Sequence, residues 1–140
     1  MDKWVMHALA SMFFAGFTSV IAKLGLSGIS GELGLTIRTL FVCAFVMAFA
    51  VMAVSANEVA TVKPHNLLWL GLSGVTTALS WIFYYKALKV GDVSTVALID
   101  KGSVVVAMLL AWVLLREVIT GRMLIGAALI LAGLLVIARK

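Results

Sequence analysis

Leu33–Val54 reads LGLTIRTLFVCAFVMAFAVMAV, a continuous apolar stretch that contains a single ionised side chain, Arg38. A helix that rises ~1.5 Å per residue needs about 20 such residues to cross ~30 Å of hydrocarbon. The apolar residues follow one another without the in-and-out alternation of a membrane-barrel strand. This stretch therefore predicts a membrane-spanning α-helix.

Apolar runs of similar length lie on both sides of this stretch. Together they predict five spans, at about residues 4–24, 33–54, 67–88, 93–115 and 122–138. Five spans take up roughly 105 residues, which leaves only short loops and no room for a soluble domain. We therefore expect a single all-α transmembrane domain over residues 1–140, built as a bundle of five helices.

The composition supports a membrane protein and excludes several other classes. The chain is 64% hydrophobic and 12% charged, with one Cys and one Pro, which argues against a soluble enzyme, a disulfide-stapled module and a disordered tail. The net charge of +5 comes from basic residues that mostly flank the apolar runs, so it indicates contact with the lipid bilayer and not with nucleic acid.

No pattern in the sequence indicates catalysis. The two histidines, His7 and His65, have no cysteine or carboxylate at ligand spacing, so we expect no metal site. There is no Gly-rich phosphate loop and no set of nucleophile and base, so we expect neither a cofactor nor an enzyme activity. Cys43 is a lone thiol in an apolar span and is expected to pack there.

Four ionisable residues lie inside the spans or at their ends: Lys23, Arg38, Asp100 and Lys101. A charge at a helix centre costs at least ~2.5 kcal/mol on insertion scales, so such residues usually face a bundle interior or a wet cavity. If the spans alternate in direction, all four lie toward the same side of the membrane. Two interpretations stay open: an inert ion pair of Asp100 with Arg38 or Lys23, and a charged vestibule that binds the polar end of a substrate.

Two aromatic residues of the third span, Trp81 and Tyr84, are candidates for lining a substrate cavity. They lie on or beside a stripe of hydroxyl-bearing residues, Ser73, Thr77 and Ser80, that recurs at helical spacing. Tyr and Trp are also common at the membrane interface, so a purely interfacial role is the alternative.

Gly126 and Gly133 form a stripe of small residues on the fifth span. Small residues let membrane helices approach closely, either within one chain or between two chains. The two glycines are therefore candidates for a dimer contact, with packing inside the chain as the alternative.

Several segments together resemble a known family. They are Trp81–Asp92 (WIFYYKALKVGD), Val96–Lys101 (VALIDK), Leu115–Glu117 (LRE) and Gly126–Gly133 (GAALILAG), with Ala22–Gly25 (AKLG) and Ile37–Thr39 (IRT) near the start. This sequence resembles the EamA-type domain of the drug/metabolite transporter superfamily, and more closely its half-size, five-span bacterial and archaeal members. The resemblance covers nearly the whole chain.

The resemblance implies secondary transport of a small metabolite, often export, in the cytoplasmic (inner) membrane. Ten-span relatives contain two such domains in inverted orientation, so a five-span chain looks like half of an inverted-repeat transporter. The fourth span has Lys101-Gly102 where many members carry a Pro, and the first span lacks the Glu with which related exporters bind cations. The basic residues inside the spans suggest instead an anionic or zwitterionic substrate.

A second interpretation of the resemblance is a non-transporting or heterodimeric subunit, for example of a lipid-linked sugar flippase. The flanking Lys and Arg residues number four on the side of the N-terminus and five on the opposite side, a bias too small to specify one orientation. Two oppositely inserted copies would rebuild an inverted repeat. The sequence therefore predicts a homodimer, and an antiparallel one in particular.

Overall fold

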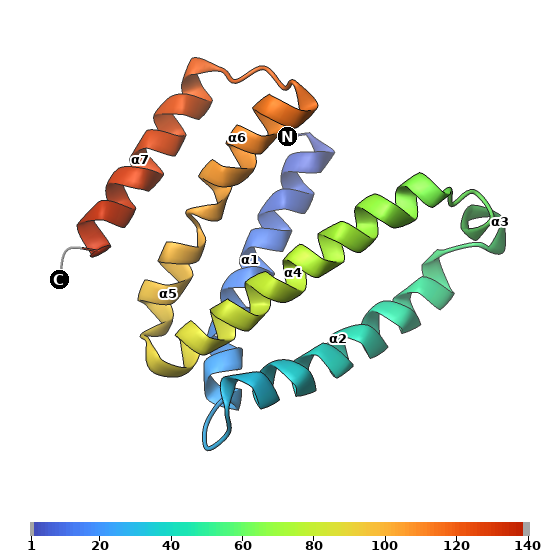
Figure 1. The fold of residues 1–140 in the computed structure, drawn as a ribbon, viewed down its shortest axis with the longest axis horizontal. Helices are drawn as coiled ribbons and strands as arrows, with labels where there is room; N and C mark the ends of the chain where they lie inside the picture. Colours follow the sequence, from blue (N-terminus) through green and yellow to red (C-terminus); the bar gives the residue numbers. More distant parts are fainter. Residues whose placement is uncertain (1, 139–140) are drawn as a thin grey trace. The chain divides into compact units, whose positions relative to one another are not determined.

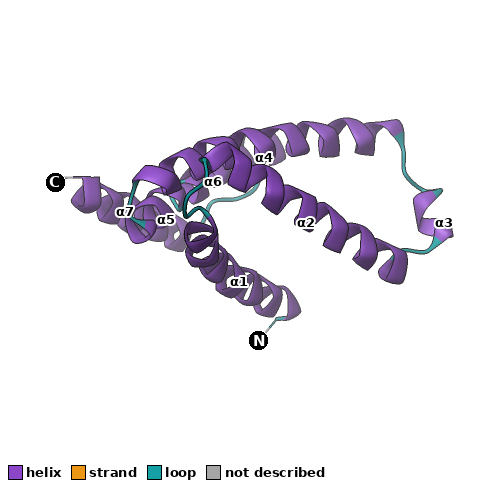
Figure 2. Cartoon of the chain, turned by 90° about the horizontal axis from the view of Figure 1, so that it is seen from below, coloured by secondary structure: helices purple, strands orange, loops and turns teal. Residues whose placement is uncertain are grey.

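The computed structural model describes residues 2–138, and all of the regular structure within that range is helical (Figures 1 and 2). The helices, in chain order, are α1 (Lys3–Gly25), α2 (Gly31–Ala53), α3 (Ala56–Val59), α4 (Pro64–Val90), α5 (Val93–Asp100), α6 (Ser103–Leu115) and α7 (Gly121–Ala138). The prediction of an all-α chain is confirmed for these residues.

Four of the five predicted spans meet the length and hydropathy of a membrane crossing: α1, α2, α4 and the continuous stretch Val93–Leu115 that contains α5 and α6. The fifth predicted span corresponds to α7, whose apolar stretch Gly121–Ile137 is shorter than the other four. At ~1.5 Å per residue this stretch covers about 25 Å, a little less than the hydrocarbon thickness. A fifth crossing by α7 therefore stays a prediction.

The fourth predicted span is interrupted between α5 and α6 (Figure 1). A Cβ atom on Gly102 would lie 3.1 Å from the carbonyl oxygen of Ile99 and 3.0 Å from Cδ1 of Leu134 on α7. Glycine lets the turn pass close to α7 because it has no side chain to displace these atoms. The interruption lies at Lys101-Gly102.

The chain divides into two compact units. One is Val20–Val90, which holds the end of α1 together with α2, α3 and α4; the other holds the beginning of α1 and the helices that follow Gly91. In the second of these units α7 packs against both α5 and α6.

Within Val20–Val90, α2 and α4 converge at one end and diverge toward α3 (Figures 1 and 2). The buried side chains of this unit, Leu26, Tyr85 and Leu88, all lie at the converging end. A Cβ atom on Gly31 would lie 3.0 Å from the carbonyl oxygen of Tyr85, so the first turn of α2 rests almost directly on the backbone of α4. The two helices are therefore anchored at one end and open between their other ends.

The connection between α2 and α4 is stabilised by a capping box at α3. The backbone N–H of Ser55 donates to Oε2 of Glu58 at 2.8 Å and its hydroxyl donates to the same oxygen at 3.0 Å, while the N–H of Glu58 donates to the Ser55 hydroxyl oxygen. These hydrogen bonds from Ser55 hold the pKa of the Glu58 carboxyl below its ordinary value.

Most of the apolar side chains point outward, including large ones on every long helix. In water such a surface would be strongly unfavourable, whereas in a bilayer it is matched by the acyl chains. The surface therefore agrees with the hydropathy of the helices and indicates a protein that lies within lipid.

Candidate functional site

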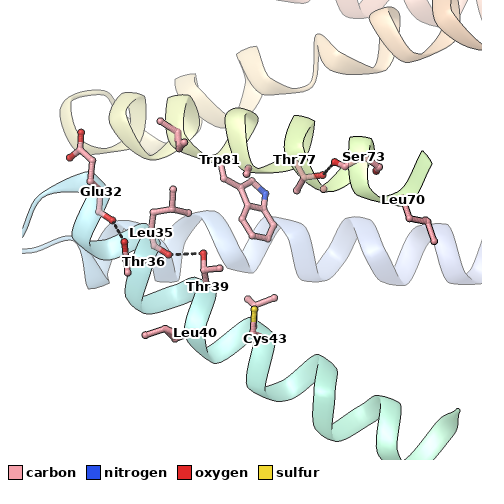
Figure 3. Close-up of a pocket in the computed structure, with 14 residues that line it drawn as sticks. Glu32, Leu35, Thr36, Thr39, Leu40, Cys43, Leu70, Ser73, Thr77 and Trp81 are labelled. Atoms are coloured by element: carbon pink, nitrogen blue, oxygen red, sulfur yellow. Dashed lines mark hydrogen bonds between the residues drawn. The ribbon is translucent and has the colours of Figure 1, made fainter. Parts of the chain in front are cut away.

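The diverging faces of α2 and α4 enclose a groove with a volume of about 880 Å³ (Figure 3). The residues of each helix that line it recur every three or four positions, so each helix presents one face to the groove. They are Glu32, Leu35, Thr36, Thr39, Leu40, Val42 and Cys43 of α2, and Leu70, Ser73, Gly74, Thr77, Ala78, Trp81 and Ile82 of α4.

Three of the hydroxyl groups in the groove donate to carbonyl oxygens of their own helices (Figure 3). Thr36 donates to Glu32 at 2.9 Å, Thr39 to Leu35 at 2.8 Å, and Thr77 to the carbonyl of Ser73 at 2.8 Å. Such bonds satisfy a hydroxyl proton in an environment without water. These three hydroxyl oxygens can therefore act toward a ligand only as hydrogen-bond acceptors.

Arg38 of α2 stacks on the aromatic side chains of α4. Its guanidinium carbon lies 4.2 Å from the centre of the Trp81 ring and 5.8 Å from the centre of the Tyr85 ring. Both distances are within the ~6 Å range of a cation–π interaction. Nη1 of Arg38 is buried and makes no hydrogen bond to any of the described residues. The aromatic rings thus hold the charge in place without neutralising it.

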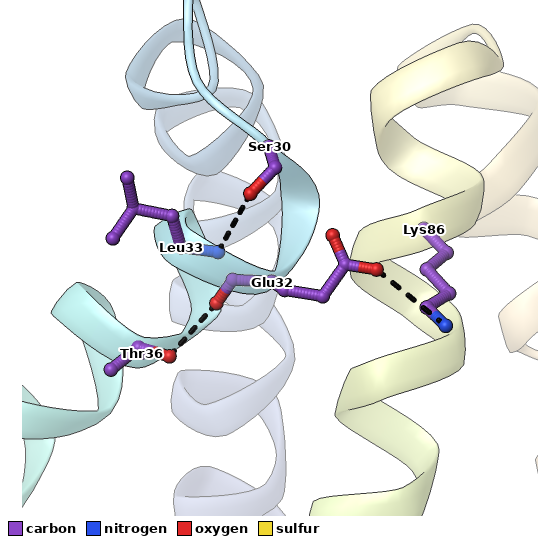
Figure 4. Close-up of polar contacts among 5 residues, drawn as sticks. All are labelled: Ser30, Glu32, Leu33, Thr36 and Lys86. Carbon is purple, nitrogen blue, oxygen red and sulfur yellow. Dashed lines mark hydrogen bonds and ion pairs between the residues drawn. The ribbon is translucent and has the colours of Figure 1, made fainter.

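An ion pair joins α2 to α4 beside the groove (Figure 4). Nζ of Lys86 lies 3.5 Å from Oε1 of Glu32, in the first turn of α2. The hydroxyl of Ser30 caps this turn by accepting from the N–H of Leu33 at 3.1 Å. Both side chains of the pair are more than half exposed, so the pair contributes little to stability unless lipid or a partner covers it.

Lys23, which the sequence offers as a substrate or coupling residue, caps the C-terminal end of α4. Its ammonium group donates to the carbonyl oxygen of Leu88 at 2.6 Å and to that of Lys89 at 3.3 Å. Lys89 in turn donates to the carbonyl oxygen of Leu26, just after α1, at 2.9 Å. Each lysine neutralises carbonyl groups that a helix end leaves without partners.

Asp100 and Lys101 lie in the other unit, at the interruption between α5 and α6. Nζ of Lys101 is 3.9 Å from Oδ2 of Asp100, a distance at the outer limit of an ion pair. The predicted pairing of Asp100 with Arg38 or Lys23 stays a prediction.

The other candidates from the sequence fall in different places. Trp81 lines the groove, whereas Tyr84 is not among the lining residues and contacts the ring of Tyr85 edge-on, with 6.3 Å between ring centres. Gly126 and Gly133 of α7 have no described atom within 4 Å of the position that a Cβ would take. Their role in a dimer contact stays a prediction.

The contribution of α2 to the groove was not predicted from the sequence. Thr36, Thr39 and Cys43 recur at positions i, i+3 and i+7, which places them on one face of the helix. That spacing was a usable signal, although it was hidden within a run that is apolar throughout.

A second hollow, of about 610 Å³, lies between the ends of α6 and α7 and includes Trp112, Arg116 and Glu117. Arg116 closes α6 in a left-handed conformation, with φ 56°, and its backbone N–H donates to the carbonyl of Ala111. The backbone of Arg116 thus caps the end of α6.

Comparisons with known proteins agree with this architecture. The model of the EamA-like transporter family matches residues 2–139. A Sinorhizobium protein named "Uncharacterized transporter in cobO 3'region" is 33% identical over 137 residues, which cover 98% of this chain and 97% of that protein. No solved structure matches the chain. Four stretches of the described residues 2–138 are able to cross a bilayer, and the family model covers nearly the whole length of the chain, so this multi-pass membrane protein belongs to the EamA-like transporter family.

Proposed function

We propose that the protein is a secondary transporter that exports a small polar or zwitterionic metabolite across the cytoplasmic membrane, and that it works as a dimer. The observation that carries this proposal is the groove between α2 and α4. Its volume of about 880 Å³ falls within the ~300–1,000 Å³ of typical small-molecule sites. Apolar walls with a few fixed polar groups are also usual for such sites.

A dimer would also account for the surface of the groove. A groove in one chain is open along its length, whereas a transported molecule must be shielded from lipid on all sides. A second copy supplies the missing wall without any further gene product, which is how half-size chains form a complete pathway.

The groove can be tested by filling it. Gly74 lines the groove and has no described atom within 4 Å of a Cβ position, so Gly74→Leu adds a side chain there without a clash. Gly71 on the same helix has equally open surroundings but does not line the groove, so Gly71→Leu is the matched control. Counterflow of labelled amino acids and small organic acids into proteoliposomes is the assay. We expect transport of at least one probe, lost in Gly74→Leu and retained in Gly71→Leu.

Equal transport by both variants would show that the groove is not the pathway. The direction of transport follows from the same probes in cells and in inverted membrane vesicles. An exporter accumulates its substrate in inverted vesicles when a proton or ion gradient is applied, and lowers its accumulation in intact cells.

A further inference from the structure

Among the charged residues in the spanning helices of Val20–Val90, Arg38 differs in having no hydrogen-bonding or ionic partner among the described residues. Glu32 is paired with Lys86, and Lys23 and Lys89 donate to carbonyl groups. Among the described residues Arg38 has only its aromatic contacts, and its Nη1 is covered. A permanent positive charge in a spanning helix is costly unless an anion accompanies it.

The stacking on Trp81 fixes how an anion can approach. A guanidinium that lies over a ring, here with its carbon 4.2 Å from the ring centre, directs its N–H groups outward in its own plane. These N–H groups match the two oxygens of a carboxylate. Nη1 is covered and Arg38 as a whole is only partly buried, so a ligand would have to approach the guanidinium edge away from Nη1.

Arg38 does not itself line the groove, but the groove runs beside it. Leu35, Thr39 and Val42 flank Arg38 along α2 and line the groove, and Trp81 takes part in both features. The walls are mainly apolar, and the hydroxyls of Thr36, Thr39 and Thr77 donate to their own helices, so the groove offers few donors for a second anionic group.

We propose that this site binds a small organic monocarboxylate with an apolar body, with the carboxylate on the accessible edge of Arg38 and the body in the groove past Trp81. One guanidinium neutralises one negative charge, so a monoanion leaves the site neutral. A phosphate dianion would leave a charge uncompensated in a medium of low dielectric constant. The proposal rests on the transport function proposed above and, of the substrates left open there, takes an anionic one in place of a zwitterionic one.

Binding can be measured with the full chain in nanodiscs and labelled 3-phenylpropionate as the probe. The competitors are 3-phenylpropionamide, which has the same shape without the charge, L-phenylalanine, which adds an ammonium group, and inorganic phosphate, which has no apolar body. We expect the carboxylate to bind at least about tenfold more tightly than each of these, as a charge-assisted pair implies.

Two test variants, each with a matched control variant, assign the binding to the site. Arg38→Gln removes the charge and should weaken binding of the carboxylate by about ten- to a hundredfold while leaving the amide within about twofold. Lys63→Gln, in the connection before α4, removes a positive charge away from the groove and should change neither. Trp81→Leu should weaken carboxylate binding, whereas Phe83→Leu, whose side chain is exposed and absent from the groove lining, should not.

Several results would overturn the proposal. These are equal binding of carboxylate and amide, binding of L-phenylalanine or phosphate as tight as that of the carboxylate, and unchanged binding in Arg38→Gln. Carboxylate binding that appears only in Asp100→Asn would show that Asp100 pairs with the guanidinium of Arg38 in the unmodified protein, and would also overturn the proposal.

The proposed transport function is tested separately from the binding site. Arg38-dependent binding without transport of any probe in proteoliposomes would reject the proposed function and keep the binding site. Transport of other probes without Arg38-dependent binding of carboxylates would keep the proposed function and reject the binding site. A carboxylate could also reach the site as a fatty acid from the bilayer, and oleate added with the lipid tests this source. Displacement of labelled 3-phenylpropionate by oleate in the unmodified protein, but not in Arg38→Gln, supports the site with entry from the bilayer.

Discussion

The ammonium group of Lys23 lies 2.6 Å from the carbonyl oxygen of Leu88, so the end of α1 is bound to the end of α4 by a single charged side chain. Lys89 returns the contact by donating to Leu26 at 2.9 Å. These reciprocal caps satisfy carbonyl groups at two helix ends and hold together the buried end of the unit.

Removal of the Lys23 ammonium should therefore destabilise the protein. In Lys23→Met the methylene stem is retained but the carbonyl groups of Leu88 and Lys89 lose a charged donor, which costs about 1–3 kcal/mol for a partly buried group. Thermal unfolding in detergent measures the loss, and Lys23→Arg should recover most of it. A variant Lys23→Met that is as stable as the unmodified protein but fails to transport would show a coupling role for Lys23 in place of the structural one.

Gly31 provides a second test of the converging end, because a Cβ there would lie 3.0 Å from a backbone atom of Tyr85. Gly31→Ala should lower the free energy of unfolding by about 1–3 kcal/mol because α2 must move away from α4. The higher helix propensity of Ala should return roughly 0.5–1 kcal/mol of this loss. Gly16→Ala, in open surroundings on α1, has the same gain and no clash. We expect the melting temperature to fall in Gly31→Ala and to stay or rise in Gly16→Ala; equal shifts would contradict the close approach.

Glu58 gives a prediction about pH, since hydrogen bonds from Ser55 lower its pKa in the folded chain. A carboxyl group with a depressed pKa stabilises the folded form above its unfolded pKa, and this contribution is lost as the pH falls through the folded pKa. The α3 connection should thus loosen at acidic pH, which should appear as a lower protection factor of the Ser55 amide once the exchange rate is corrected for the slower intrinsic exchange at low pH. Glu58→Gln should show this lower protection already at neutral pH, and Ser55→Ala should bring the pKa of Glu58 back toward its ordinary value in an NMR titration.

The pairing of Asp100 with Arg38, or with Lys23 as the second choice, is testable by cross-linking. Cys43→Ala removes the single native thiol, after which Arg38→Cys and Asp100→Cys form a pair for a short bifunctional thiol reagent. Glu32→Cys with Lys86→Cys is the positive control, because the structure brings these two side chains within 3.5 Å. We expect the control pair to react; reaction of Arg38→Cys with Asp100→Cys as well would support the pairing and would contradict the carboxylate site at Arg38. Reaction of the control alone, and of neither Arg38→Cys nor Lys23→Cys with Asp100→Cys, would reject the pairing.

The antiparallel homodimer predicts two orientations of the chain. Reporter fusions after the C-terminus should give signal on both sides of the membrane, and two lysines added after Met1 should fix one orientation and lower the activity. A single orientation with full activity would exclude this assembly.

Gly126 and Gly133 are the matching candidates for the contact between copies. Gly126→Leu and Gly133→Leu should weaken dimerisation measured by dilution in detergent, because a large side chain prevents close approach of two helices. Gly16→Leu, on α1, is a control with equally open surroundings. Dimerisation equal to that of the control would place the contact elsewhere.

The sequence by itself determined the helices that cross the membrane, because hydrocarbon requires every backbone group to bond within its own helix and leaves a long apolar run as the visible sign. The predicted boundaries 33–54 and 67–88 differ from α2 and α4 by a few residues, since α2 begins at Gly31 and α4 at Pro64, ahead of their apolar parts. The weak point was the end of the chain, where an apolar run of marginal length did not specify a crossing.

The partners of the charged residues were decided only by tertiary structure. Periodicity marks the face on which Arg38 or Lys23 lies, but contacts between helices depend on which faces meet and at what depth. In the folded chain Lys23 caps the end of α4, Glu32 forms an ion pair with Lys86, and Arg38 lies over the ring of Trp81. The groove arises from the divergence of α2 and α4 beyond Gly31, an angle set by close backbone contact at one end, which no local pattern of residues encodes.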